Sequence, residues 1–251
     1  MRTPCVAGNW KMHKTVAEAL DLTEALIPGL DEILGVDNVI CPPFTSLAPL
    51  ADLLEGSKIE LGAQNLFWEE QGAYTGEVSP GMIAELAEYV IIGHSERRGY
   101  FGETDETVNQ RLRAALEQGL KPILCVGETL EENEAEKTRA VVRRQLERGL
   151  LDLAFFDARQ LMVAYEPVWA IGTGKAATPE IANQVIQEVV RNQLAELYSA
   201  DFADGVRILY GGSVKPDNAE SFFEQPGIDG ALVGGASLRA EDFIAITRAA
   251  A

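Results

Sequence analysis

The chain of 251 residues is 47% hydrophobic and 24% charged, a composition typical of a soluble globular protein with a large core. Its formal net charge of −18 argues against nucleic acid and anionic membrane surfaces as partners, because both would be repelled. It shows neither the apolar stretch of a signal peptide nor an apolar run long enough to cross a membrane, so we expect a cytoplasmic protein.

Eight short apolar runs are predicted strands, and longer amphipathic segments separate them. The runs are continuously apolar rather than alternating, which is expected of parallel strands buried on both faces. In chain order they cover residues 5–9, 39–41, 59–63, 89–92, 122–126, 161–165, 207–210 and 231–233.

Helices are predicted between these strands. Ser79-Pro80 and Thr178-Pro179 each supply an N-cap followed by a proline at the first helical position. Gly119 closes the helix that contains Leu112 and Leu116, at a point where a left-handed residue is favoured. The other predicted helices cover residues 16–26, 45–54, 135–150, 218–224 and 240–250, and the helix that begins at Pro179 ends near Leu197.

This alternation predicts an α/β protein in which eight parallel strands, ringed by helices, close into a single barrel domain over residues 1–251. The alternative is an open, doubly wound sheet. The dinucleotide-binding form of that sheet would carry a G-x-G-x-x-G sequence after a strand, and no predicted strand is followed by one. The number of strands, the chain length and the positions of polar residues favour the barrel.

The three cysteines are Cys5, Cys41 and Cys125, and each lies in one of the apolar runs. An odd, sparse and buried set argues against disulfides. The sequence contains no Cys-x-x-Cys pair and no histidine cluster, so we predict no metal site.

Glu166 follows the sixth predicted strand and precedes a loop with the sequence Pro167-Val168-Trp169-Ala170-Ile171-Gly172-Thr173-Gly174. Barrel enzymes place their catalytic groups at the carboxyl ends of the strands. Pro167 and Trp169 stiffen the start of the loop, whereas Gly172 and Gly174 free its tip. We therefore predict a general base that works beneath a lid, and a solvated loop glutamate is the alternative.

Other polar residues also follow predicted strands, and in a closed barrel they all face one rim. Asn9 and Lys11 follow the first strand, and His94 follows the fourth. Taken alone, Lys11 has an ordinary interpretation as a surface lysine and His94 as a satisfied residue at a strand end. We expect Glu96 to form a structural ion pair with one of the two arginines that follow it. The convergence of these residues on one rim favours a functional site over separate structural roles.

Two glycine segments, Gly211-Gly212-Ser213 and Gly234-Gly235, follow the last two predicted strands. Glycines let backbone N–H groups approach an anion, and a short helix after Gly234 would point its positive end toward it. The last two strand-to-helix loops are the common phosphate site of barrel enzymes. We therefore predict a small phosphate ester as the ligand, with Lys11 adding a cation and Gly172 an amide.

A carboxylate base, a histidine donor and a lysine around such a ligand suit proton abstraction next to a carbonyl group, because the enediolate formed needs donors at its oxygens. Two other interpretations remain. A different phosphosugar enzyme on the same barrel would explain the glycine segments but not Lys11, His94 and Glu166 together. A barrel that only binds or assembles would not need all three residues.

Six segments of the chain carry motifs that point to a known family. They are Gly8-Asn9-Trp10-Lys11-Met12, Tyr74-Thr75-Gly76-Glu77, Gly93-His94-Ser95-Glu96-Arg97-Arg98, the segment from Tyr165 to Gly174, Tyr210-Gly211-Gly212-Ser213-Val214 and Leu232-Val233-Gly234-Gly235-Ala236. Together they resemble the triosephosphate isomerase family, in the family's order and over nearly the whole chain. The resemblance implies a TIM barrel that interconverts dihydroxyacetone phosphate and D-glyceraldehyde 3-phosphate in glycolysis and gluconeogenesis, without a cofactor.

The resemblance also implies a role for individual residues. Glu166 matches the family's base, His94 its neutral imidazole and Lys11 its cation. The imidazole stays neutral because the chain turns helical just after His94, so that the helix dipole disfavours a positive charge there. The remaining assignments are Asn9 beside the lysine, the phosphate-binding residues Gly172, Ser213, Gly234 and Gly235, the carboxylate of Glu96 near the lysine, and Cys125 as a buried packing residue.

Two loops complete the resemblance. The lid corresponds to Pro167, Val168, Trp169, Ala170, Ile171, Gly172, Thr173, Gly174, Lys175, Ala176 and Ala177. A loop that contains Tyr74, Thr75 and Gly76 implies a homodimer, because in the family it inserts into the other subunit near Lys11. Ala176 stands where the family often has threonine, and this departure leaves the expected reaction unchanged.

Overall fold

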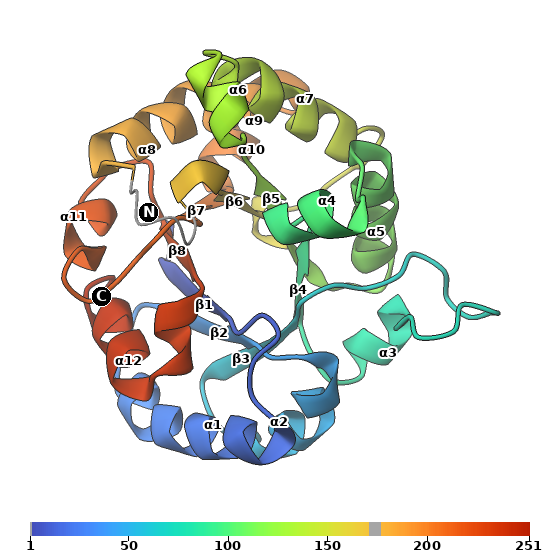
Figure 1. Ribbon diagram of the computed structural model, residues 1–251, viewed down its shortest axis with the longest axis vertical. Helices are drawn as coiled ribbons and strands as arrows, with labels where there is room; N and C mark the ends of the chain where they lie inside the picture. The colour runs from blue at the N-terminus through green and yellow to red at the C-terminus, as the bar shows by residue number, and fades with distance from the viewer. Residues whose placement is uncertain (1, 171–176) are drawn as a thin grey trace.

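The computed structural model of the protein describes residues 2–170 and 177–251. Eight parallel strands follow one another in chain order and close into a barrel, because β1 pairs with β8 as well as with β2 (Figure 1). The strands are β1 (Cys5–Asn9), β2 (Asp37–Cys41), β3 (Ile59–Ala63), β4 (Tyr89–Ile92), β5 (Lys121–Val126), β6 (Met162–Tyr165), β7 (Arg207–Tyr210) and β8 (Gly230–Val233). The predicted α/β barrel is confirmed.

Helices surround the barrel. They are α1 (Val16–Asp31), α2 (Leu47–Leu53), α3 (Pro80–Ala84), α4 (Ser95–Phe101), α5 (Asp105–Glu117), α6 (Leu130–Glu134), α7 (Thr138–Gly149), α8 (Pro179–Val185), α9 (Asn192–Leu197), α10 (Ala200–Gly205), α11 (Ala219–Phe223) and α12 (Ala240–Arg248), and the π-helical segment η4 (Ile186–Arg191) joins α8 to α9. Short 3-10 turns are η1 (Phe44–Ser46), η2 (Ala158–Gln160), η3 (Val168–Ala170) and η5 (Gly235–Leu238).

The core has two layers, which explains why the strand sequences are continuously apolar. One set of strand residues fills the barrel interior, and it includes Ala7, Val39, Ile91 and all three cysteines. Residues that alternate with them, such as Val6, pack outward against the helices. The cysteines are free and buried, and burial raises the pKa of Cys5 to about 12.

Three helix predictions need correction. The helix predicted over residues 135–150 is present but begins only at Thr138, because Glu136 has a left-handed φ of 57° that separates α6 from α7. Helix α1 continues past Leu26 to Asp31 and takes in Pro28, with Leu30 fully buried at its end. Helix α10 was not predicted, and it begins where the Ser199 side chain accepts a hydrogen bond from the backbone N–H of Phe202.

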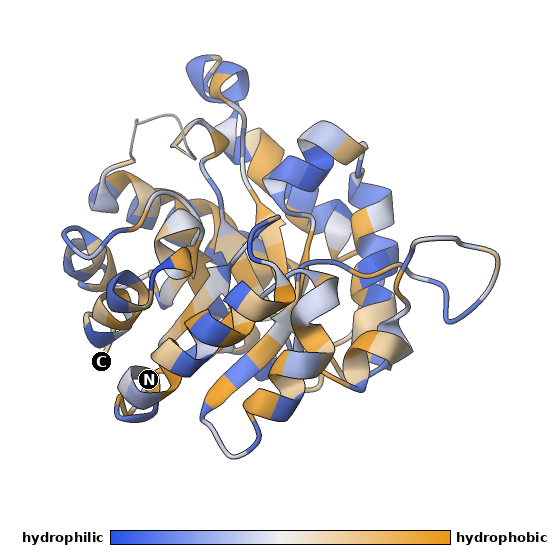
Figure 2. Ribbon diagram, turned by 60° about the horizontal axis from the view of Figure 1, so that its bottom comes forward, coloured by the Kyte–Doolittle hydropathy of each residue, from blue (hydrophilic) through white to orange (hydrophobic). Residues whose placement is uncertain are grey.

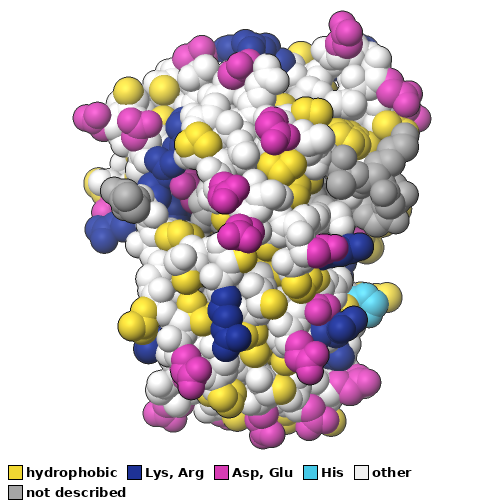
Figure 3. All heavy atoms as spheres, turned by 90° about the vertical axis from the view of Figure 1, so that its left-hand side faces the viewer, with side chains coloured by type: hydrophobic (Ala, Val, Ile, Leu, Met, Phe, Trp, Pro, Cys, Tyr) yellow, Lys and Arg dark blue, Asp and Glu magenta, His cyan; other side chains and the backbone are white. Residues whose placement is uncertain are grey.

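Residues 64–79 connect β3 to α3 and project from the body of the barrel (Figures 1 and 2). On the face shown in Figure 3, acidic side chains are spread out rather than gathered in one patch. Among the helices of the described residues, none is long and apolar enough to cross a membrane.

Candidate active site

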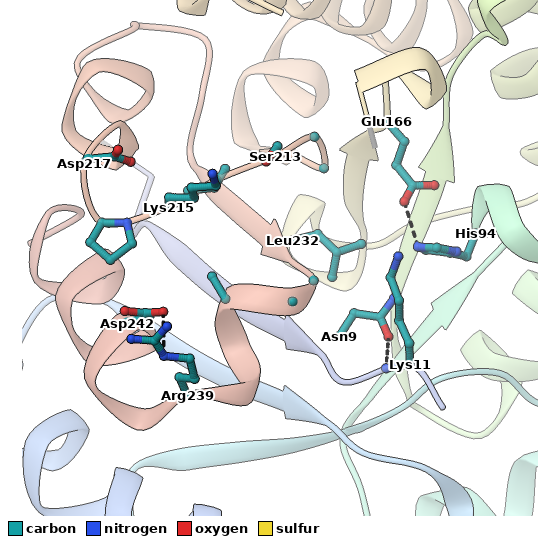
Figure 4. Close-up of a pocket in the computed structure, with 17 residues that line it drawn as sticks. Asn9, Lys11, His94, Glu166, Ser213, Lys215, Asp217, Leu232, Arg239 and Asp242 are labelled. Carbon is teal, nitrogen blue, oxygen red and sulfur yellow. Dashed lines mark hydrogen bonds and ion pairs between the residues drawn. The ribbon is translucent and has the colours of Figure 1, made fainter. Parts of the chain in front are cut away.

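A cavity of about 670 Å³ opens at the carboxyl ends of the strands. Its walls bring together seven of the predicted site residues, which come from five different strand ends: Asn9, Lys11, His94, Glu166, Ser213, Gly234 and Gly235. Figure 4 shows Lys11, His94 and Glu166 close together on one side and Ser213 on another. Residues that are distant in sequence therefore converge because the parallel strands all end at this rim.

Glu166 is held at the end of β6 with only 2% of its surface exposed. Its backbone N–H donates to the carbonyl of Val126 at 2.8 Å. Its carboxylate lies 2.9 Å from Nε2 of His94 through Oε1, and its Oε2 accepts a hydrogen bond of 2.9 Å from the backbone N–H of Ser95. Gly211 passes so close that a Cβ there would lie 2.7 Å from Cγ of Glu166. Two donors and a glycine backbone thus fix the carboxylate.

The surroundings keep Glu166 ionised. Burial raises the pKa of the carboxyl group, but the charge of His94, the hydrogen bond from His94 and the hydrogen bond from Ser95 N–H together lower it by more. The pKa of Glu166 consequently lies below its ordinary value of 4.5. At neutral pH the group is a carboxylate and is able to accept a proton.

His94 is the N-cap of α4, as the sequence predicts. Its Nδ1 accepts a hydrogen bond of 3.2 Å from the backbone N–H of Glu96, so the ring proton of the neutral form is on Nε2. Burial lowers the pKa of His94, but the charge of Glu166 and the hydrogen bond to it outweigh that effect, so the pKa lies above its ordinary value. This rise in the pKa of His94 depends on an ionised Glu166, and it disappears when Glu166 takes up a proton.

Lys11 adopts an unusual left-handed backbone with a φ of 52°. Oδ1 of Asn9 accepts a hydrogen bond of 3.0 Å from its N–H, and Nε2 of Gln64 donates to its carbonyl at 2.8 Å. The Lys11 ammonium lies 2.6 Å from Oε1 of Glu96. These contacts hold a cation at the edge of the cavity.

The predicted ion pair between Glu96 and a neighbouring arginine is wrong. Arg97 instead pairs with Glu103, and Arg98 pairs with Asp105 at 2.6 Å. Helix α4 causes this, because consecutive residues on a helix point in different directions and so reach different partners. Glu96 is left to pair with the lysine.

The glycine segments form another wall of the cavity, beside Lys11. Gly234 is followed by the 3-10 turn η5, which confirms the short helix expected there. A Cβ at Gly234 would lie 3.4 Å from Cε of Lys11, and a Cβ at Gly235 would meet no atom within 4 Å. The lysine, the glycine backbones and Ser213 therefore border one space, where an anion would meet N–H donors and a positive charge.

The predicted lid lies partly outside the described residues, because Ile171, Gly172, Thr173, Gly174, Lys175 and Ala176 are not among them. Its first part, after Pro167, forms η3 from Val168 to Ala170. The Trp169 indole donates from Nε1 to the buried Glu128 at 2.8 Å, and the hydroxyl of Tyr165 also reaches that carboxylate. Ala177, where the predicted lid ends, is buried.

Three residues at the site carry no role in the sequence analysis. Ser95 acts through its backbone N–H, which no side-chain pattern reveals. Glu128 follows β5, and its position after a strand is the signal that would have indicated it. Leu232 is buried in β8, lines the cavity and lies within one of the matching segments, so its position in that segment would have indicated it.

The resemblance also gave Cys125 as a buried packing residue and the projecting loop as the contact with a second subunit. Cys125 is fully buried, and burial raises the pKa of its thiol. In the projecting loop, the Tyr74 ring packs 4.7 Å from the ring of Phe67, and Thr75 and Gly76 follow at the exposed tip. Over residues 2–170 and 177–251, no group of three or more His, Cys, Asp or Glu side chains is arranged to hold a metal ion.

Comparisons with known proteins agree with this geometry. The family model described as triosephosphate isomerase matches residues 4–250. Proteins named triosephosphate isomerase from Carboxydothermus hydrogenoformans and Caldanaerobacter subterraneus subsp. tengcongensis are 55% and 56% identical, with 99% and 98% of this chain and 99% of each relative covered. A crystal structure of triosephosphate isomerase from Bartonella henselae superposes with a TM-score of 0.90 at 40% identity, covering 98% of both chains. The chain therefore belongs to the triosephosphate isomerase family.

Proposed function

We propose that Glu166, His94 and Lys11 carry out the proton transfers of this family's reaction in the cavity at the strand ends. The chain is an isomerase of glycolysis and gluconeogenesis that interconverts dihydroxyacetone phosphate and D-glyceraldehyde 3-phosphate. The observation that supports the residue assignment is the 2.9 Å contact between the Glu166 carboxylate and Nε2 of His94, in the same cavity as the Lys11 ammonium.

Glu166, which matches the family's base, removes a proton from the carbon next to the substrate carbonyl. The C–H electron pair moves into the carbon skeleton and makes an enediolate. The Nε2–H of His94 donates to the oxygen that gains charge, and Lys11 stabilises the same charge. Glu166 then returns the proton to the neighbouring carbon, while Nε2 of His94 gives its proton to the charged oxygen and takes the hydroxyl proton from the other oxygen, so that carbonyl and hydroxyl exchange positions.

The phosphate group of the substrate binds at the wall formed by the glycine segments. Backbone N–H groups of the segments at Ser213, Gly234 and Gly235 serve as donors, and Asn9 and Lys11 complete the polar border between phosphate and reacting carbons. We assign Gly172 to the same phosphate group from its match to the family. This arrangement brings donors to the anion although the net charge of the chain is −18.

Glu96 and Cys125 support this machinery without touching the reacting atoms. Glu96 orients Lys11 through their ion pair, and Cys125 packs in the barrel interior behind Glu166. The segment from Pro167 to Ala177 acts as the lid. The lid would keep water away from the enediolate, because water would promote side reactions of this intermediate.

The assembly that fits these assignments is a cytoplasmic homodimer of single-domain subunits. Exposed apolar side chains after β1, in the projecting loop and on α4 support an interface there, namely Met12, Tyr74, Tyr100 and Phe101. Tyr74, Thr75 and Gly76 form the segment that would enter the second subunit near its Lys11. The barrel uses strands from both ends of the chain, β1 beside β8, which supports a single domain.

A direct assay tests the function. The purified protein is mixed with D-glyceraldehyde 3-phosphate, without added cofactor or metal, and the formation of dihydroxyacetone phosphate is followed. Rapid conversion to an equilibrium mixture is expected. A different phosphosugar enzyme would leave this triose unchanged but act on another phosphorylated sugar, and a binding barrel would retain the ester without converting it.

A further inference from the structure

Gln145 is a polar residue on the buried side of helix α7. The helix buries Val141, Val142 and Leu146 on the same side, and Gln145 itself is only 5% exposed. A buried amide is unfavourable unless its donor and acceptor are both satisfied. Both are satisfied by Gly127: Oε1 accepts from the N–H of Gly127 at 2.7 Å, and Nε2 donates to its carbonyl at 3.0 Å.

Gly127 belongs to the segment that supports the backbone of Glu166. The N–H of Glu166 donates to the carbonyl of Val126 at 2.8 Å, and the N–H of Val168 donates to the carbonyl of Glu128 at 3.1 Å. Gly127 lies between these two bonds, and a Cβ there would be 1.7 Å from the carbonyl oxygen of Glu166. Because the backbones of Gly127 and Glu166 are in close van der Waals contact, a displacement of Gly127 would move Glu166 as well.

We propose that Gln145 is a positioning residue for Glu166, acting through Gly127. Gln145 bonds the polar groups of Gly127, while Val126 and Glu128 bond the backbone of the loop that begins at Glu166. Gln145 lies in the wall of a separate cavity of about 510 Å³, behind Glu166, and it therefore acts without contacting the substrate side. The inference rests on the proposed role of Glu166 as the base.

The chain contains a matched control for this residue. Gln64 is also a glutamine with two hydrogen bonds to backbone, because its Nε2 donates to the carbonyls of Lys11 at 2.8 Å and Cys41 at 2.9 Å. It supports the lysine rather than the base. Substituting Gln64 should therefore affect both substrate binding and turnover through Lys11, whereas substituting Gln145 should affect turnover alone.

The first experiment measures kcat and KM for wild type, Gln145→Met and Gln64→Met, since methionine keeps the length of the side chain and removes its hydrogen bonds. Losing two hydrogen bonds behind the base should lower kcat roughly tenfold in Gln145→Met and leave KM within about twofold of wild type. In Gln64→Met both KM and kcat should change, because Lys11 faces the phosphate and the enediolate. A kcat of Gln145→Met within twofold of wild type would contradict the inference.

A second variant separates positioning from general stability. In Gln145→Glu, a protonated carboxyl group reproduces the donor and the acceptor of the amide, whereas the ionised group presents only acceptors to the Gly127 carbonyl. The kcat of this variant relative to wild type should therefore fall as pH rises from 5 to about 10, a range that spans the pKa of about 8–9 reached by buried glutamates, while circular dichroism shows the protein folded throughout. A ratio that does not change with pH would overturn the proposal, and this measurement decides the question even if Gln145→Met does not fold.

The two proposals fail differently. If Glu166 is not the base, Glu166→Gln retains turnover. If only the inference about Gln145 is wrong, Glu166→Gln loses turnover while the Gln145 variants behave like wild type.

Discussion

At the scale of single residues, the site depends on a small number of close polar contacts. The Glu166 carboxylate has two donors at 2.9 Å, and the Lys11 ammonium has Glu96 at 2.6 Å. His94 is oriented by an amide on one ring nitrogen, which leaves the other to donate. Each reactive group therefore has a partner that fixes it before a substrate arrives, as electrostatic preorganisation requires.

Lys11→Met should impair both binding and turnover. The change removes a partly buried cation that faces the phosphate and the developing enediolate, and a loss of roughly 10²–10³-fold in kcat/KM is expected for one preorganised donor. Steady-state kinetics at low and high salt checks this. If salt abolishes the difference from wild type, Lys11 acts only as a long-range attractive charge and the assignment is wrong.

At the scale of elements, the strands are predicted well from the sequence. β1, β3, β4 and β7 have the predicted bounds, since a buried parallel strand needs an uninterrupted apolar run. The break at Glu136 was not predictable, because residues 135–137 all favour helix; the left-handed residue ends α6 through local hydrogen bonds, in which the N–H of Lys137 donates to the carbonyl of Glu132 at 2.8 Å.

Some residues of the candidate site can be predicted from the sequence and others cannot. Side chains that follow strands, such as His94 and Glu166, are found from their position. Contacts made by backbone groups or by residues far apart in sequence, such as Ser95 with Glu166 or Gln145 with Gly127, leave no pattern in the sequence, because folding alone brings them together.

Glu128, at the end of β5, should make stability depend on pH. Burial raises its pKa above the usual 4.5, despite the hydrogen bonds from Trp169 and Tyr165. A carboxyl group with a raised folded-state pKa contributes stability below pH 4.5, and that contribution is lost as pH rises through the folded-state value. The stability of wild type relative to Glu128→Gln should therefore decline as pH rises above the ordinary carboxyl value of 4.5.

Urea unfolding of both proteins across this pH range measures the effect, and Glu131→Gln on the exposed helix α6 is the control. A relative stability of wild type that rises with pH would show that the carboxylate is stabilised, not disfavoured, at this position.

At the scale of the whole molecule, the barrel presents its reactive groups at one rim and a projecting loop beside them (Figures 1 and 2). Replacing residues 71–76 with a short Gly/Ser turn should give a monomer with weakened activity, since this loop is the proposed contact with a second subunit near Lys11. Light scattering at micromolar concentration, together with the isomerase assay, checks both parts.

A matched substitution tests whether any exposed apolar residue would have the same effect. Leu34→Ser removes an exposed leucine before β2, at the opposite end of the barrel, and should leave the assembly unchanged. A monomeric wild type at micromolar concentration would refute the dimer.

The central claim is that Glu166 is the base, and Glu166→Gln tests it most directly. The amide cannot take up a proton, so kcat should fall by roughly 10²–10⁴-fold, the usual contribution of a general base. The glycine segments and Lys11 are untouched, so inorganic phosphate should inhibit or bind as in wild type. A large loss of kcat with phosphate binding retained is the predicted result, and near-normal turnover in Glu166→Gln would contradict the account.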